Sequence, residues 1–149
     1  MDAAMMKAVA QAGAVATLSL AAFGSMAGAC VAGLAAVGGW KKCYAQKKAA
    51  PFILVVFIGA PLSQTIYGMI LMNAIRNAPS FENWLAMSTA GILGGIALGV
   101  SAWLQGVAGA ACADAQAETN QGFGNYLMTV GIIETVALFV LVFSLGTLK

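Results

Sequence analysis

The chain has 149 residues, of which 61% are hydrophobic and only 8% are charged, with a net charge of +2 and no histidine. This composition is too apolar for a soluble domain of this length. The small charge and the lack of a basic, aromatic-interleaved patch give no sign of a nucleic-acid partner, and the three cysteines have neither metal-site spacing nor a disulfide framework.

Four long apolar stretches with almost no charge follow one another along the chain. A helix needs about 20 apolar residues to cross a bilayer, and only structures that satisfy their own backbone hydrogen bonds can do so. We therefore predict one membrane domain, residues 1–149, with transmembrane helices at 8–44, 50–76, 83–117 and 121–148. At about 1.5 Å per residue, the first and third exceed a ~30 Å apolar slab, so we expect them to tilt or project from it.

The loops between these stretches predict the topology in a cell membrane. Residues 41–48 carry four lysines, which by the positive-inside tendency lie in the cytoplasm. The loop around residues 114–121 then also lies in the cytoplasm, and both termini and the loop at 76–82 face outside. The four lysines either only set this topology or also contact a cytoplasmic partner or anionic lipid.

The four predicted helices are of two kinds. The first and third are rich in glycine and alanine and contain the small-residue ridges Gly24-x3-Gly28 and Gly91-x3-Gly95-x3-Gly99, which let helix backbones approach closely. The second and fourth carry bulky Phe, Ile, Leu, Val and Met instead. This alternation predicts a duplicated hairpin, in which the first and third helices are inner and the second and fourth are outer.

Glu134 lies near the middle of the fourth apolar stretch, and no other residue from Thr119 to Leu148 is charged. Burying a carboxylate in a membrane costs free energy, so such a residue indicates a functional site by default. The alternative is a structural carboxyl that stays protonated and hydrogen-bonded between helices.

Polar groups on the second helix share one face, because Ala60, Ser63, Gln64 and Tyr67 are spaced i, i+3, i+4 and i+7. Pro61 lacks an N–H and clashes with the preceding turn, so it should kink the helix and loosen nearby carbonyls. This face then offers the Ala60 carbonyl, the Ser63 hydroxyl and the Gln64 amide oxygen, while the Tyr67 hydroxyl is placed to hold Glu134 in a supporting role.

Gln105 on the third helix reaches the depth of Glu134 if the turn between the third and fourth helices centres near Thr119 and Asn120. The two glutamines alone have a simpler interpretation, since interhelical amide bonds worth about 1 kcal/mol are common in membranes. Together with a carboxylate they predict an ion site. Several hard oxygens suit Na+, whereas H+ needs only one carboxyl and one acceptor, so we expect Na+ with H+ as the alternative.

These residues carry a family resemblance. The stretch Pro61–Gly68 (PLSQTIYG), the pair Gln105-Gly106 and the pair Glu134-Thr135 resemble the ion-site motifs of the rotor-ring proteolipid of V-type ATPases, most closely its bacterial sodium-translocating branch. Ser63 stands where that branch usually has threonine, which keeps the hydroxyl. Val107 stands where a lysine often follows the glutamine.

The resemblance implies an all-α protein that assembles into a rotor ring and turns past a stator. Its expected partners are further copies of itself, a stator membrane subunit with an arginine, a cytoplasmic central-stalk subunit and lipid. The chain has no phosphate-binding Gly-Lys-Ser/Thr motif and therefore no expected catalytic site or cofactor, only Na+ or H+ as cargo. Two other classes remain open: a small four-helix proton-coupled exporter, whose glutamate usually lies in the first helix, and a purely structural membrane protein.

Overall fold

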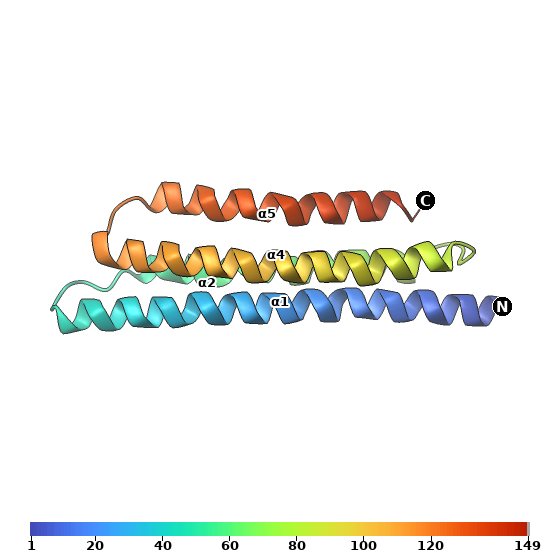
Figure 1. Ribbon diagram of the computed structural model, residues 1–149, viewed down its shortest axis with the longest axis horizontal. Helices are drawn as coiled ribbons and strands as arrows, with labels where there is room; N and C mark the ends of the chain where they lie inside the picture. Colours follow the sequence, from blue (N-terminus) through green and yellow to red (C-terminus); the bar gives the residue numbers. More distant parts are fainter. Residues whose placement is uncertain (149) are drawn as a thin grey trace.

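The computed structural model describes residues 1–148, and these form long helices aligned along one axis with no strand among them (Figure 1). In chain order the elements are α1 (Ala3–Ala45), the 3-10 turn η1 (Phe52–Leu54), α2 (Val55–Gly59), the 3-10 turn η2 (Ala60–Leu62), α3 (Ser63–Arg76), α4 (Trp84–Thr119) and α5 (Phe123–Gly146). Four spans are long and apolar enough to cross a membrane: Ala3–Ala45, Phe52–Arg76, Trp84–Thr119 and Phe123–Gly146. The chain is an all-α, multi-pass membrane protein.

The helix ends differ by a few residues from the sequence-based bounds. α1 begins at Ala3 rather than at residue 8, because the Asp2 side chain accepts a hydrogen bond of 2.8 Å from the Met5 N–H and caps the helix. α4 runs to Thr119 and α5 begins at Phe123. The tight turn between them uses left-handed backbone at Asn120 (φ 52°) and Gly122 (φ 82°), where a residue without a Cβ is least strained.

The second span is not one continuous α-helix. It changes to 3-10 geometry over Ala60–Leu62 and resumes as α3 at Ser63. Pro61 lies at the centre of the change, since it cannot donate to the preceding turn. The predicted kink is therefore a short 3-10 segment, and it falls at the depth where the polar face of this span begins.

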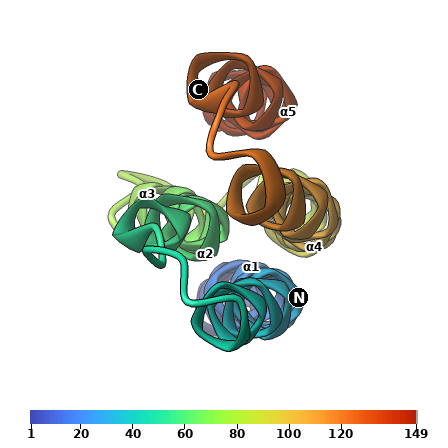
Figure 2. The ribbon, with the colours of Figure 1, turned by 90° about the vertical axis from the view of Figure 1, so that its left-hand side faces the viewer.

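The chain runs up and down twice with the same arrangement. α1 and α4 run parallel and pack along most of their length, the α2–α3 span runs back beside both, and α5 lies on the far side of α4 from α1 (Figures 1 and 2). The glycine-rich helices thus pair with each other and the bulky spans pack outside that pair. This is the arrangement that the alternation of small and bulky helices predicted within one chain.

Glycine allows α1 and α4 to approach this closely. A Cβ atom on Gly95 would lie 2.8 Å from the Thr17 Cα atom, and one on Gly24 or Gly106 would overlap the backbone of the facing helix. The contacts are backbone against backbone, so no side-chain rotation can relieve a larger residue here. The predicted ridge at Gly91, Gly95 and Gly99 is in this interface.

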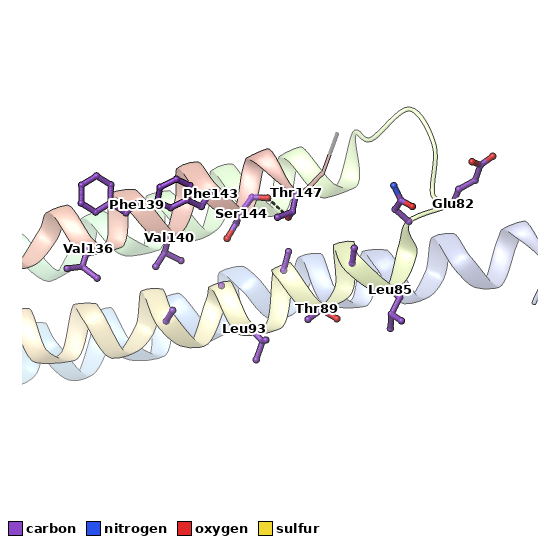
Figure 3. Close-up of a pocket in the computed structure, with 15 residues that line it drawn as sticks. Glu82, Leu85, Thr89, Leu93, Val136, Phe139, Val140, Phe143, Ser144 and Thr147 are labelled. Carbon is purple, nitrogen blue, oxygen red and sulfur yellow. Dashed lines mark hydrogen bonds between the residues drawn. The ribbon is translucent and has the colours of Figure 1, made fainter.

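An apolar groove of about 970 Å³ separates α4 from α5 in the half of the bundle farthest from the α4–α5 turn (Figure 3). Leu93 lies on its α4 side, and Val136, Phe139 and Phe143 lie on its α5 side, with Ser144 and Thr147 near its end. None of the polar residues singled out from the sequence lines it. The groove shows that α5 is held against α4 mainly in the other half, where the polar site lies.

Candidate ion-binding site

The two glutamines predicted from the sequence meet directly. Gln64 on α3 donates from Nε2 to Oε1 of Gln105 on α4 over 2.7 Å. Both side chains are fully buried, with an exposed fraction of 0%. Because an unpaired amide in an apolar interior costs about 1–3 kcal/mol, each glutamine fixes the orientation of the other.

Glu134 on α5 joins this pair at mid-bundle. Its Oε1 accepts a hydrogen bond of 2.6 Å from the Tyr67 hydroxyl, and its Oε2 lies 3.5 Å from Gln105 Nε2. The carboxyl is half-buried, and within residues 1–148 the only salt bridge is the distant Lys42–Glu118 pair. The carboxylate is therefore held by neutral donors and has no fixed cation among the described residues.

The 3-10 segment supplies the remaining oxygens. The Ser63 hydroxyl donates to the Ala60 carbonyl over 3.0 Å and lies 3.2 Å from Gln64 Oε1. The Ala60 carbonyl also accepts the Ser63 backbone N–H, as 3-10 geometry requires. Each of these oxygens keeps a lone pair, so a rotation of the hydroxyl would turn several oxygens toward one point.

The structure thus brings together all six groups predicted from the sequence: the Ala60 carbonyl and the side chains of Ser63, Gln64, Tyr67, Gln105 and Glu134. Thr135, which belongs to the resembling motif, does not join them. Its hydroxyl is exposed and donates to the Ile132 carbonyl over 2.6 Å.

One group at the site has no sequence signal. The Val130 carbonyl on α5 accepts a hydrogen bond of 3.1 Å from Gln105 Nε2. Gln105 Nε2 is thereby directed at α5, and its Oε1 at Gln64. Every residue has a carbonyl, so only the geometry of the α4–α5 pair identifies this one.

The charge at the site restricts the ligand. Glu134 is the one ionisable carboxyl in the cluster, and no group of three or more His, Cys, Asp or Glu able to hold a metal ion occurs in residues 1–148. A single carboxylate is neutralised by one monovalent cation or one proton. A divalent cation would leave a net buried charge, which costs several kcal/mol.

The comparisons with known proteins bear on the second hairpin. Residues 88–146 match the family model of the ATP synthase proteolipid, ATP-synt_C. This stretch contains Gln105 and Glu134 and covers most of α4 and α5, whereas α1 and the α2–α3 span lie outside it. The search of curated proteins found no match. The chain is therefore similar, over its second hairpin, to a membrane subunit of ATP synthases.

Proposed function

We propose that this chain is the ion-carrying subunit of a rotor ring in a rotary ATPase, of the V-type sodium branch, and that it binds one Na+ at Glu134. The observation that carries the proposal is the cluster of Glu134, Gln64 and Gln105 at mid-bundle. It lies in a four-helix membrane chain whose second hairpin matches the ATP-synt_C family.

In this function the site binds and releases an ion without chemistry on the chain itself. Neutralised by its ion, Glu134 passes through lipid as the ring turns, because the charged form carries a penalty of several kcal/mol there. A stator arginine and local water would release the ion by stabilising the bare carboxylate. ATP hydrolysis belongs to other subunits, which drive the ring through a central stalk on the cytoplasmic side.

The number of oxygens favours Na+ over H+. The Ala60 carbonyl, the Ser63 hydroxyl and the two amide oxygens surround the carboxyl, and hard cations prefer such ligands. A proton needs only one acceptor. H+ is the alternative cargo, since a protonated Glu134 would be a donor that one of these oxygens can accept.

Carbodiimide labelling of Glu134 tests the cargo. A hydrophobic carbodiimide attacks the protonated carboxyl, so bound Na+ should protect Glu134 at millimolar concentration near neutral pH. Potassium and choline are the controls. Protection by Na+ alone supports a sodium site, and equal labelling in all three salts at every pH shows that the site takes only protons.

Imaging of the purified oligomer tests the ring. A closed ring of identical subunits around a lipid-filled centre is the expected result. A monomer or a two-fold dimer in every detergent and in nanodiscs would contradict the rotor role and favour an exporter.

A further inference from the structure

An aromatic layer lies between the candidate ion site and the end of the bundle that carries the loop 41–48. Phe57 on α2 is fully buried, and its ring centroid lies 5.8 Å from that of Phe123 and 6.5 Å from that of Tyr126, both on α5. Tilted and edge-on pairs at these distances are favourable aromatic contacts. The three rings connect the second span to α5 across the face of α4.

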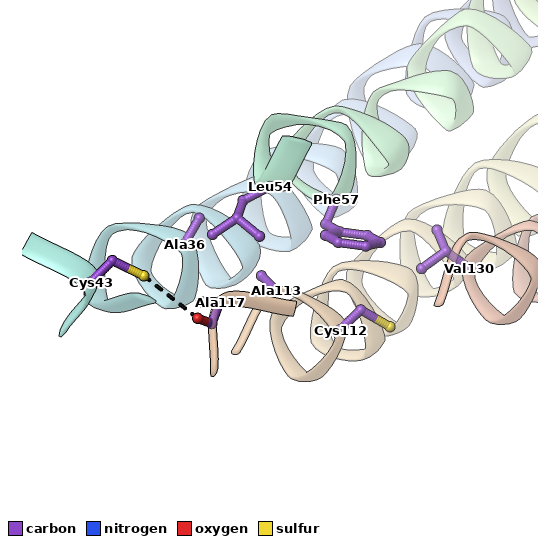
Figure 4. Packing of buried hydrophobic residues seen from close by; sticks show 8 residues of the cluster. All are labelled: Ala36, Cys43, Leu54, Phe57, Cys112, Ala113, Ala117 and Val130. Atoms are coloured by element: carbon purple, nitrogen blue, oxygen red, sulfur yellow. Dashed lines mark hydrogen bonds between the residues drawn. The ribbon is translucent and has the colours of Figure 1, made fainter. Parts of the chain in front are cut away.

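The layer has no gap on its α4 side. A Cβ atom on Gly109 would lie 3.0 Å from the Phe57 carbonyl oxygen and 3.6 Å from the Phe57 Cβ atom, so the backbones of α2 and α4 touch here. Leu54, Ala36 and Ala113, each with an exposed fraction of 0%, continue the packing toward α1. Figure 4 shows Phe57 among these residues, with Val130 of α5 beside it.

Polar groups occur on both sides of this layer along one face of α4. Gln105, Gly109, Cys112 and Gln116 follow at i, i+4, i+7 and i+11. Gln105 belongs to the ion site, Gly109 contacts Phe57, and Cys112 lies against the Tyr126 carbonyl. Gln116 therefore lies on the loop side of the aromatic layer.

Gln116 points to water on that side. Its exposed fraction is 4%, and within residues 1–148 its Oε1 atom is buried without a hydrogen-bond partner. Buried amide oxygens of this kind are normally hydrated. Gln105 and Gln116 are about 16 Å apart along the helix at 1.5 Å per residue, and the aromatic layer occupies the interval.

We propose that Phe57, Phe123 and Tyr126 form a seal that closes the direct route between the loop end of the bundle and the candidate ion site. The proposal rests on the proposed function of that site. Its consequence is that an ion exchanges only sideways, where Glu134 is half-buried between α3 and α5. A protomer sealed in this way does not leak its ion along its own axis while it is away from the stator.

Silver access to single cysteines tests the seal without reference to transport. Ag+ is a small monovalent cation that reacts with thiols. Val130→Cys places a thiol on the site side of the layer and keeps the Val130 backbone carbonyl, whereas Gln116→Cys places one on the loop side. The oligomer is reconstituted in vesicles whose outward loop 41–48 is identified by trypsin cleavage, with trapped free thiol to scavenge Ag+ that enters. Mass spectrometry follows the peptides that contain residues 116 and 130.

With Phe57 intact, Val130→Cys should react with external Ag+ at least tenfold more slowly than Gln116→Cys. Adding Phe57→Ala or Tyr126→Ala should speed the reaction at residue 130 at least tenfold. Phe143→Ala, which removes a ring with 72% exposure from the other half of α5, should leave it unchanged.

Two results would overturn the seal: equal rates at residues 116 and 130 while Phe57 is present, or no acceleration in either alanine variant that retains its helix content and oligomer size. The first comparison needs no disruptive variant, so it decides even if Phe57→Ala fails to assemble. Because the readout is thiol chemistry, a failed seal leaves the ion site and ring untouched. Failure of carbodiimide protection, in turn, bears on the cargo alone.

Discussion

At the scale of single residues, the site is arranged so that a carboxyl deep in the bundle is never without partners. Tyr67 donates to one oxygen of Glu134 over 2.6 Å, and Gln105 approaches the other. Gln105 is in turn held by Gln64 and by the Val130 carbonyl. This network positions the oxygens before an ion arrives, which reduces the cost of ordering them on binding.

Gln105→Leu should weaken Na+ protection of Glu134 about tenfold, while labelling in the absence of Na+ persists. The substitution removes one ligand oxygen and leaves the Gln64 amide unpaired, and 1.4 kcal/mol corresponds to a factor of ten in affinity. The measurement is the Na+ concentration that halves the carbodiimide labelling rate.

Gln116→Leu is the matched control, since it removes a buried glutamine from the same face of α4 outside the site. An equal loss of protection in both variants would mean that the effect comes from helix packing and not from an ion ligand.

The candidate site could largely be predicted from the sequence, because helical spacing places Ala60, Ser63, Gln64 and Tyr67 on one face whatever the rest of the chain does. The inter-helix details could not. That Gln64 donates to Gln105, and that Gln105 also donates to Val130, depends on the rotation of α4 and α5 about their axes. No spacing within one helix encodes that rotation.

At the scale of elements, two features define the bundle: the close pair of α1 and α4, and the break in the second span. The glycines of the pair were readable as a ridge, and the ridge does face the other helix. Pro61 was expected to kink its helix, but a sequence pattern does not say whether a proline bends a helix or converts a turn to 3-10 geometry. The start of α1 at Ala3 depends on one side-chain cap at Asp2.

Gly99→Leu should strongly destabilise the chain and disrupt its oligomer. A Cβ atom at this position would already lie 2.5 Å from the Leu20 carbonyl oxygen, and backbone cannot rotate away from a larger side chain. Thermal unfolding of the purified protein, followed with its elution volume, measures the effect.

Gly146→Leu supplies the control, since a Cβ atom there meets nothing within 4 Å. If Gly99→Leu unfolds at the same temperature as Gly146→Leu and forms an oligomer of the same size, the close α1–α4 contact is not required.

At the scale of the whole molecule, the duplicated path of the chain carries one carboxylate instead of two. The second hairpin holds Glu134 on α5, and the corresponding α2–α3 span holds Ser63, Gln64 and Tyr67, which serve the same site. In the proposed ring, each protomer of four helices then carries one ion. A ring of the same helix count built from two-helix protomers would carry twice as many per turn.

The composition alone was enough to predict four membrane spans, and the structure confirms them. The arrangement of copies in a ring and the side of the membrane on which each loop lies involve other chains and the bilayer. They are therefore predictions from loop charge and family resemblance.

Ion transport by the Glu134→Gln variant tests the central claim most directly. The assembled ATPase is reconstituted in vesicles, and ATP-driven ion uptake is measured together with the oligomer's size. Glutamine has nearly the same shape as glutamate but cannot carry the charge that a cation or proton neutralises. We predict that transport is abolished while the ring assembles normally. Normal ATP-driven transport by an intact Glu134→Gln ring would contradict the account.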